Sequence, residues 1–158
     1  MLSRDELVRD YERNRRIVQT QCDGLSHADS LIQPPFNSNC LNWTVGHLVV
    51  HRDKALQTMG AEPVLDPESF ARYTNESDPV LEDGPDVRKL EELLAALDET
   101  QERLAETIVD ADLEAVLEGD DRGRTIGQRV RFLYFHDTYH TGQTELLRAL
   151  AGRTDKVI

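Results

Sequence analysis

Cysteine is scarce in this chain, and its scarcity argues against two kinds of site. Cys22 and Cys40 are the only cysteines, and they match neither a metal-ligand spacing nor a redox motif. We interpret both side chains as buried free thiols in a reducing compartment, although the sequence leaves a disulfide between them open.

Basic residues are also in the minority. Lysine and arginine total 18 against 30 aspartates and glutamates, which gives a formal net charge of -12. A surface with this excess of negative charge repels phosphates, and no basic cluster offsets it. The composition therefore argues against nucleic acid as a partner, and we interpret the acidity as a solvated surface.

Long apolar runs and several catalytic motifs are missing as well. No run approaches the length of a membrane span, and the polar start of the chain has no signal-peptide core, so we expect a cytoplasmic protein with no membrane partner. A glycine-rich phosphate loop, a Gly-x-Ser-x-Gly elbow and a His-Glu-x-x-His motif are all absent. A zincin protease is therefore disfavoured.

Helical signals dominate what is present. Apolar residues make up 39% of the chain and charged residues 30%, a balance typical of globular proteins. We expect a single domain over residues 1–158, which is long enough to bury a core. No segment shows the alternation of a strand, so we predict an all-α fold.

Capping patterns and apolar spacing delimit four helices. Ser3 with Glu6, and Thr125 with Gln128, form capping boxes, and glycines supply several stop signals. The predicted helices run from Ser3 to Asp23, from Trp43 to Met59, from a cap at Asp86 to Ile108, and from Thr125 to Ala151.

The segments between these helices differ in length. Residues 25–42 contain Pro34-Pro35 and are predicted to be mostly loop. Residues 61–85 hold four prolines and many acidic residues, and we predict a long connection with a short turn of helix inside it. Connections of this length commonly cover something functional. Four helices with one long connection indicate a four-helix bundle.

Histidine supplies the clearest chemical signal. His136 and His140 are four residues apart on the last predicted helix, so their side chains lie on one face about one turn apart. Such a pair can bind one metal ion if another helix provides a third ligand. His47 and His51, also four apart on the second predicted helix, are the candidates. Periodicity does not choose between them.

Other readings of these residues are more ordinary. A His-x-x-x-His spacing also arises on surfaces or in pairs of hydrogen-bonded histidines. We interpret His27, in a predicted loop, as exposed. The aromatic group Phe132, Phe135 and Tyr139 falls on another face of the last helix. Core packing is its ordinary meaning, and a dimer interface is the more specific one.

At these residues the chain resembles the DinB/YfiT-like superfamily of bacterial four-helix-bundle proteins. The run Asn42–Leu48, NWTVGHL, resembles the second-helix motif of that superfamily, and Asp53, Leu56 and Gly60 continue the likeness. The run from His136 to Gly152 resembles its last-helix motif. With the helix spacing, the resemblance covers nearly the whole chain.

The resemblance implies an up-down-down-up bundle, commonly a homodimer. The connection predicted over residues 61–85 lies between the second and third helices of this bundle. It also implies a divalent metal, which is zinc, nickel or iron, bound by His47, His136 and His140. His51 would then lie beside the ligands or replace His47. Known members include S-transferases and isomerases that use low-molecular-weight thiols such as bacillithiol or mycothiol.

These observations lead to three hypotheses. The first is a metal-dependent thiol S-transferase, whose low-molecular-weight thiol cofactor reacts with a small-molecule substrate. The second is metal-assisted hydrolysis. The third is a non-catalytic bundle that stores or senses a metal, or only dimerises. The catalytic residues, the native metal and the substrate are not specified by the sequence.

Overall fold

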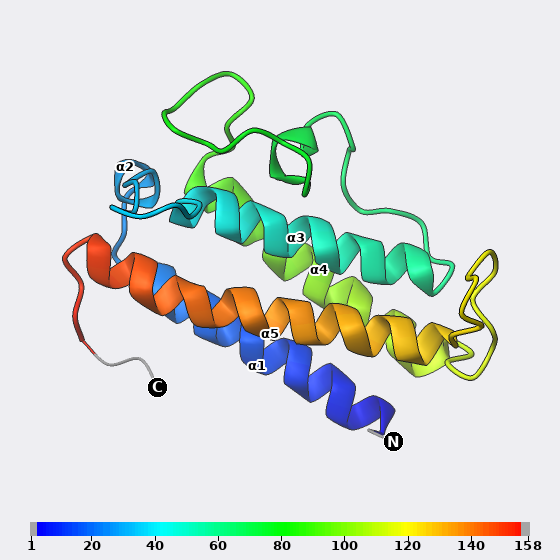
Figure 1. The fold of residues 1–158 in the computed structure, drawn as a ribbon. Helices are drawn as coiled ribbons and strands as arrows, with labels where there is room; N and C mark the ends of the chain where they lie inside the picture. The colour runs from blue at the N-terminus through cyan, green and yellow to red at the C-terminus, as the bar shows by residue number, and fades with distance from the viewer. Residues whose placement is uncertain (1–2, 156–158) are drawn as a thin grey trace.

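Four long helices form an up-down-down-up bundle in the computed structural model, which describes residues 3–155. Figure 1 shows α1 and α5 running one way while α3 and α4 run the other, so the predicted topology is confirmed. Among the described residues, no helix is both long and apolar enough to cross a membrane. The elements are α1 (Arg4–Cys22), α2 (His27–Ser30), α3 (Leu41–Thr58), the 3-10 helix η1 (Ala71–Tyr73), α4 (Leu90–Asp110) and α5 (Ile126–Leu150).

Reciprocal side-chain caps fix two of the helix starts as predicted. Ser3 accepts from the amide of Glu6, whose carboxylate accepts from the amide of Ser3. Thr125 and Gln128 make the same exchange at the start of α5. The predicted cap at Asp86 is wrong, because the chain stays irregular up to Lys89, which caps α4.

The segment before α3 contains one helical turn, α2, although its prolines led us to predict mostly loop. Ser26 and Asp29 form a capping box that begins α2, within the stretch expected to be loop. His27 lies on this turn and is not the exposed loop residue that we expected. Its Nε2 is 3.2 Å from a carboxylate oxygen of Asp83, and its side chain is only 16% exposed.

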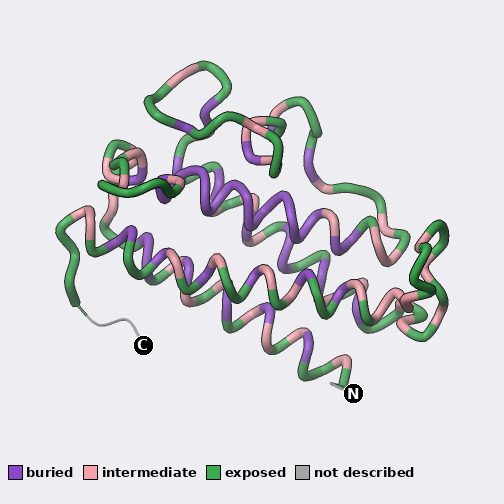
Figure 2. The backbone as a smooth tube through the Cα atoms, in the orientation of Figure 1, coloured by how far each residue is buried: buried purple, intermediate pink, exposed green. Residues whose placement is uncertain are grey.

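The long connection, residues 61–89, packs along α3 and forms a covering segment over that helix (Figure 1). Every residue from Cys40 to Asp53 is buried, which explains why apolar residues occur on all sides of this helix. In Figure 2 the tube of α3 is coloured as buried along most of its length, and it lies between the other helices of the bundle and the covering segment. Asp53 holds the start of the covering segment against α3, since its carboxylate accepts a hydrogen bond of 2.7 Å from the amide of Val64. The predicted helical turn inside the connection is η1.

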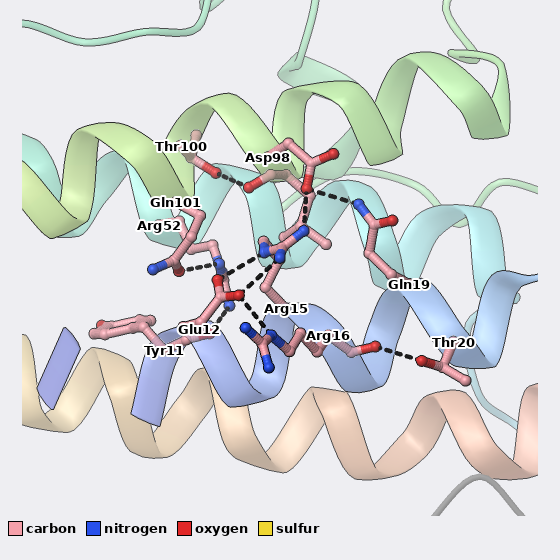
Figure 3. A network of polar contacts seen from close by, with 11 residues as sticks. Tyr11, Glu12, Arg15, Arg16, Gln19, Thr20, Arg52, Asp98, Thr100 and Gln101 are labelled. Carbon is pink, nitrogen blue, oxygen red and sulfur yellow. Dashed lines mark hydrogen bonds and ion pairs between the residues drawn. The ribbon is translucent and has the colours of Figure 1, made fainter. Parts of the chain in front are cut away.

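One buried arginine contacts all four long helices. Arg52 of α3 is 1% exposed and forms an ion pair with Asp137 of α5, with an N–O distance of 2.7 Å. Figure 3 shows its guanidinium near Tyr11 of α1, whose carbonyl it binds, and Gln101 of α4, whose side-chain oxygen it binds. Asn14 of α1 donates to the same aspartate. Both buried charges are therefore satisfied, as burial requires.

We predict that Arg52→Met destabilises the protein strongly, because it leaves the carboxylate of Asp137 buried without its cation. The expected loss in the free energy of unfolding is about 3–5 kcal/mol. Arg103→Met is the control, since Arg103 pairs with Glu106 on the exposed side of α4 and should cost less than ~1 kcal/mol. Urea denaturation followed by circular dichroism measures both. Equal losses in the two variants would contradict the role of the buried pair.

Candidate metal centre

Three histidines from two helices come together between α3 and α5. His47 comes from α3, and His136 and His140 come from successive turns of α5. Each offers one ring nitrogen, and these nitrogens lie within 4.8 Å of one another. The Nε2 atom of His136 is 3.3 Å from that of His47 and 3.2 Å from that of His140. The side chains that the sequence singled out are therefore adjacent in space.

Hydrogen bonds on the far side of two rings determine where their protons lie. The Nδ1 atom of His47 is 2.8 Å from the carbonyl oxygen of Tyr73, and that of His140 is 2.7 Å from the side-chain oxygen of Gln143. Both oxygens only accept, so each Nδ1 carries the proton and each neutral ring presents a bare lone pair at Nε2. Outer contacts of this kind orient metal-binding histidines.

The third ring cannot satisfy both lone pairs. A single proton on Nε2 of His136 can be donated to His47 or to His140, but not to both. Among residues 3–155, the buried Nδ1 atom of His136 has no hydrogen-bond partner. The group therefore concentrates acceptor atoms around one point, and a cation placed there would satisfy all three.

Burial keeps these rings neutral near pH 7. The pKa of His47 and that of His136 are both lowered to about 3, mainly by removal from water and in smaller part by the neighbouring imidazoles. The same loss of water lowers the pKa of His140. Because metal ions bind the neutral form of imidazole, protons compete weakly for these nitrogens at neutral pH.

Anionic side chains near the group are already engaged. Asp137 is paired with Arg52, and Asp53 accepts hydrogen bonds from the covering segment. Cys22 and Cys40 are buried and do not belong to the group of possible ligands found among residues 3–155. The candidate donor set thus consists of three neutral imidazoles, which are ligands that divalent transition metals accept.

His51 lies beside the group and is not part of it. Its ring stacks on that of His136, with centroids 3.8 Å apart and planes at 22°. A stacked ring presents its face to its neighbour, so its nitrogens do not point where the three Nε2 atoms meet. Its Nε2 is 2.9 Å from the side-chain oxygen of Asn75 in the covering segment. The geometry therefore groups His47 with the α5 pair.

Several supporting residues were missed by sequence reasoning. Tyr73 and Asn75 orient two histidines from within the long connection, where no pattern marked them. Gly46 permits this approach, because a Cβ atom there would lie 2.2 Å from the ring of Tyr73. Trp43 stacks on His47 at 4.3 Å. Gln143 could have been found from its three-residue spacing after His140.

Comparisons with known proteins agree with this fold. A crystal structure of the conserved protein of locus from Enterococcus faecalis matches with a TM-score of 0.76 and 14% identity, covering 97% of this chain and 99% of that chain. At that identity the likeness shows the fold alone. No curated protein matches the chain. A family model described as the DinB superfamily matches residues 10–144, which is most of the sequence. The resemblance inferred from the histidine motifs is thereby confirmed, and the chain belongs to the DinB superfamily.

Proposed function

We propose that this protein is a divalent-metal-dependent enzyme that transfers a low-molecular-weight thiol to a small electrophile. The observation that carries the proposal is the convergence of three neutral imidazole nitrogens, in a group that includes no anionic ligand from residues 3–155. A divalent ion held there would supply a Lewis acid that lowers the pKa of a thiol entering the site. The chain's own residues fix the ligands, because Tyr73 and Gln143 hold two of the rings.

The thiol must come from outside the chain. Cys22 is buried, and removal from water raises the pKa of its thiol to about 12. Burial likewise raises the pKa of Cys40, whose sulfur donates to the carbonyl of Val80. Neither cysteine can therefore act as a nucleophile at neutral pH. In the proposed reaction a sulfur–carbon bond forms, the thiol proton is released and a leaving group departs from the electrophile.

We predict that the protein binds one divalent ion and that His140→Ala abolishes stoichiometric binding, because two remaining ligands hold a metal poorly. His27→Ala is the matched control, since His27 pairs with Asp83 away from the group. His51→Ala should have the smaller effect of the two site variants. Metal analysis of protein purified without an affinity tag measures all of these. Unchanged metal content in His140→Ala would contradict the assignment of His140 as a metal ligand.

We also predict that small thiols bind at this centre. In cobalt-substituted protein, a low-molecular-weight thiol should produce a sulfur-to-metal charge-transfer band, with release of a proton, and His140→Ala should lose it. A screen with electrophiles then measures thiol consumption. Absence of the band with several thiols, with cobalt confirmed in place, rejects thiol transfer. Ester or amide turnover without thiol would indicate the hydrolase alternative instead.

Assembly into a homodimer is the second part of the proposal. Three aromatic side chains of α5 lie outside the core of the bundle. They are Phe132, Phe135 and Tyr139, which are 51%, 65% and 59% exposed. A row of exposed aromatic side chains on one helix is typical of an interface rather than of a solvated surface. Two copies related by a two-fold axis would cover this face on both chains.

We predict that light scattering gives the mass of two chains at micromolar concentration and that Phe135→Glu gives the mass of one, because a buried charge opposes association. Leu81→Glu is the control, since Leu81 is a comparably exposed apolar residue, at 64%, on the covering segment. The control should remain dimeric. A single-chain mass for the unmodified protein would refute this proposal.

A further inference from the structure

Two cations lie at one end of the histidine group. Lys54 follows His51 by one turn on α3, and Arg129 precedes His136 by two turns on α5. Because α3 and α5 are neighbouring helices of opposite direction (Figure 1), both positions lie toward the same end of the group. Both side chains are half-buried. Within residues 3–155 neither forms an ion pair.

Such cations are unexpected in a chain with this composition. Acidic residues exceed basic residues by 12, so a carboxylate partner would be easy to supply. Arg129 instead packs its guanidinium over the ring of Phe132, 5.3 Å from its centroid. Lys54 and Arg129 also share the helix faces that carry the histidines, because Lys54 follows His47 by two turns on α3 and Arg129 precedes His136 by two turns on α5.

The local charge becomes strongly positive when a metal is bound. Three neutral imidazoles contribute no negative charge, the carboxylate of Asp137 is neutralised by Arg52, and the buried carboxylate of Asp53 offsets only one of the remaining positive charges. The two positive side chains therefore add to the two positive charges of a divalent ion. A site of this kind attracts anions even though the whole chain is acidic, because the local field at a half-buried position outweighs screened, distant charges.

We propose that the thiol substrate of this centre is an organic anion. Its carboxylate binds between Lys54 and Arg129 while its sulfur reaches the three histidines. The inference rests on the proposed function in that it places a thiol at the histidine group. It adds the chemical class of that thiol and assigns two residues to its recognition. These residues position the substrate through charge and do not take part in bond formation.

The test compares two thiols of equal length in cobalt-loaded protein. The carboxylate thiol is 4-mercaptobutanoate, and the neutral thiol is 4-mercaptobutan-1-ol. From the charge-transfer band, we expect the carboxylate thiol to bind about tenfold more tightly, and Lys54→Gln or Arg129→Gln to reduce this preference to roughly threefold or less. Equal affinities in the unmodified protein, or a preference that survives in both variants, overturns the proposal.

Arg131→Gln is the matched control for loss of a positive charge from α5. Arg131 is exposed and faces a groove that Ser3 and Arg4 of α1 also line, away from the histidines. The control should therefore keep the full preference for the carboxylate thiol. Loss of the preference in Arg131→Gln to the same extent as in Arg129→Gln would show a general effect of net charge, and it would overturn the assigned site.

Tryptophan fluorescence tests anion binding at Lys54 and Arg129 without requiring a thiol to bind. Trp43 is the only tryptophan and stacks on His47, so its fluorescence reports on the site. If no thiol produces a cobalt band, butanoate and butan-1-ol are titrated into zinc-loaded protein instead. A fluorescence response to butanoate that Lys54→Gln removes then supports the anion site while thiol transfer is rejected. No response to butanoate in that experiment rejects the anion site as well.

Discussion

The arrangement of the bundle depends on the buried ion pair between Arg52 and Asp137. From α3, the arginine donates two hydrogen bonds to Asp137 of α5 and one each to α1 and α4, and these contacts replace the water lost on burial. Displacing α3 along α5 would separate the two charges and leave both buried without a partner, which costs several kcal/mol. The pair therefore favours one register of α3 against α5 over its alternatives.

The same register assembles the histidine group. His51 directly precedes Arg52, and His136 directly precedes Asp137, so the contact that aligns the helices also aligns the two histidine-bearing turns. His47, one turn earlier on α3, then reaches the α5 pair. The charged side chains point into the bundle, while the imidazoles lie toward the covering segment. A carbonyl of that segment sets the proton position on one ring. Fold and site thus share one alignment.

Local signals account for what the sequence predicted. Capping boxes and the four-residue spacing of His136 and His140 depend on a single helix, so the long helices and the paired face were predictable. The choice of His47 over His51 depends on how α3 is rotated in the bundle, and only the family resemblance indicated it. The hydrogen bond from His47 to the carbonyl of Tyr73 could not be predicted, because residues 61–89 have no periodic pattern that would indicate their path over α3. The cap at Asp86 was misplaced because an acidic residue before an apolar stripe does not show how far the irregular segment continues.

We propose that three neutral imidazoles hold one divalent ion and leave coordination positions open to solvent or substrate. X-ray absorption spectroscopy of zinc-loaded protein, without added thiol, measures the ligands of the ion. We expect three imidazole ligands with zinc–nitrogen distances of about 2.0–2.1 Å, with light solvent atoms in the remaining positions. Four imidazole ligands would place His51 in the set and close a position. A sulfur ligand at about 2.3 Å, or a shell without imidazole, would rule out this site.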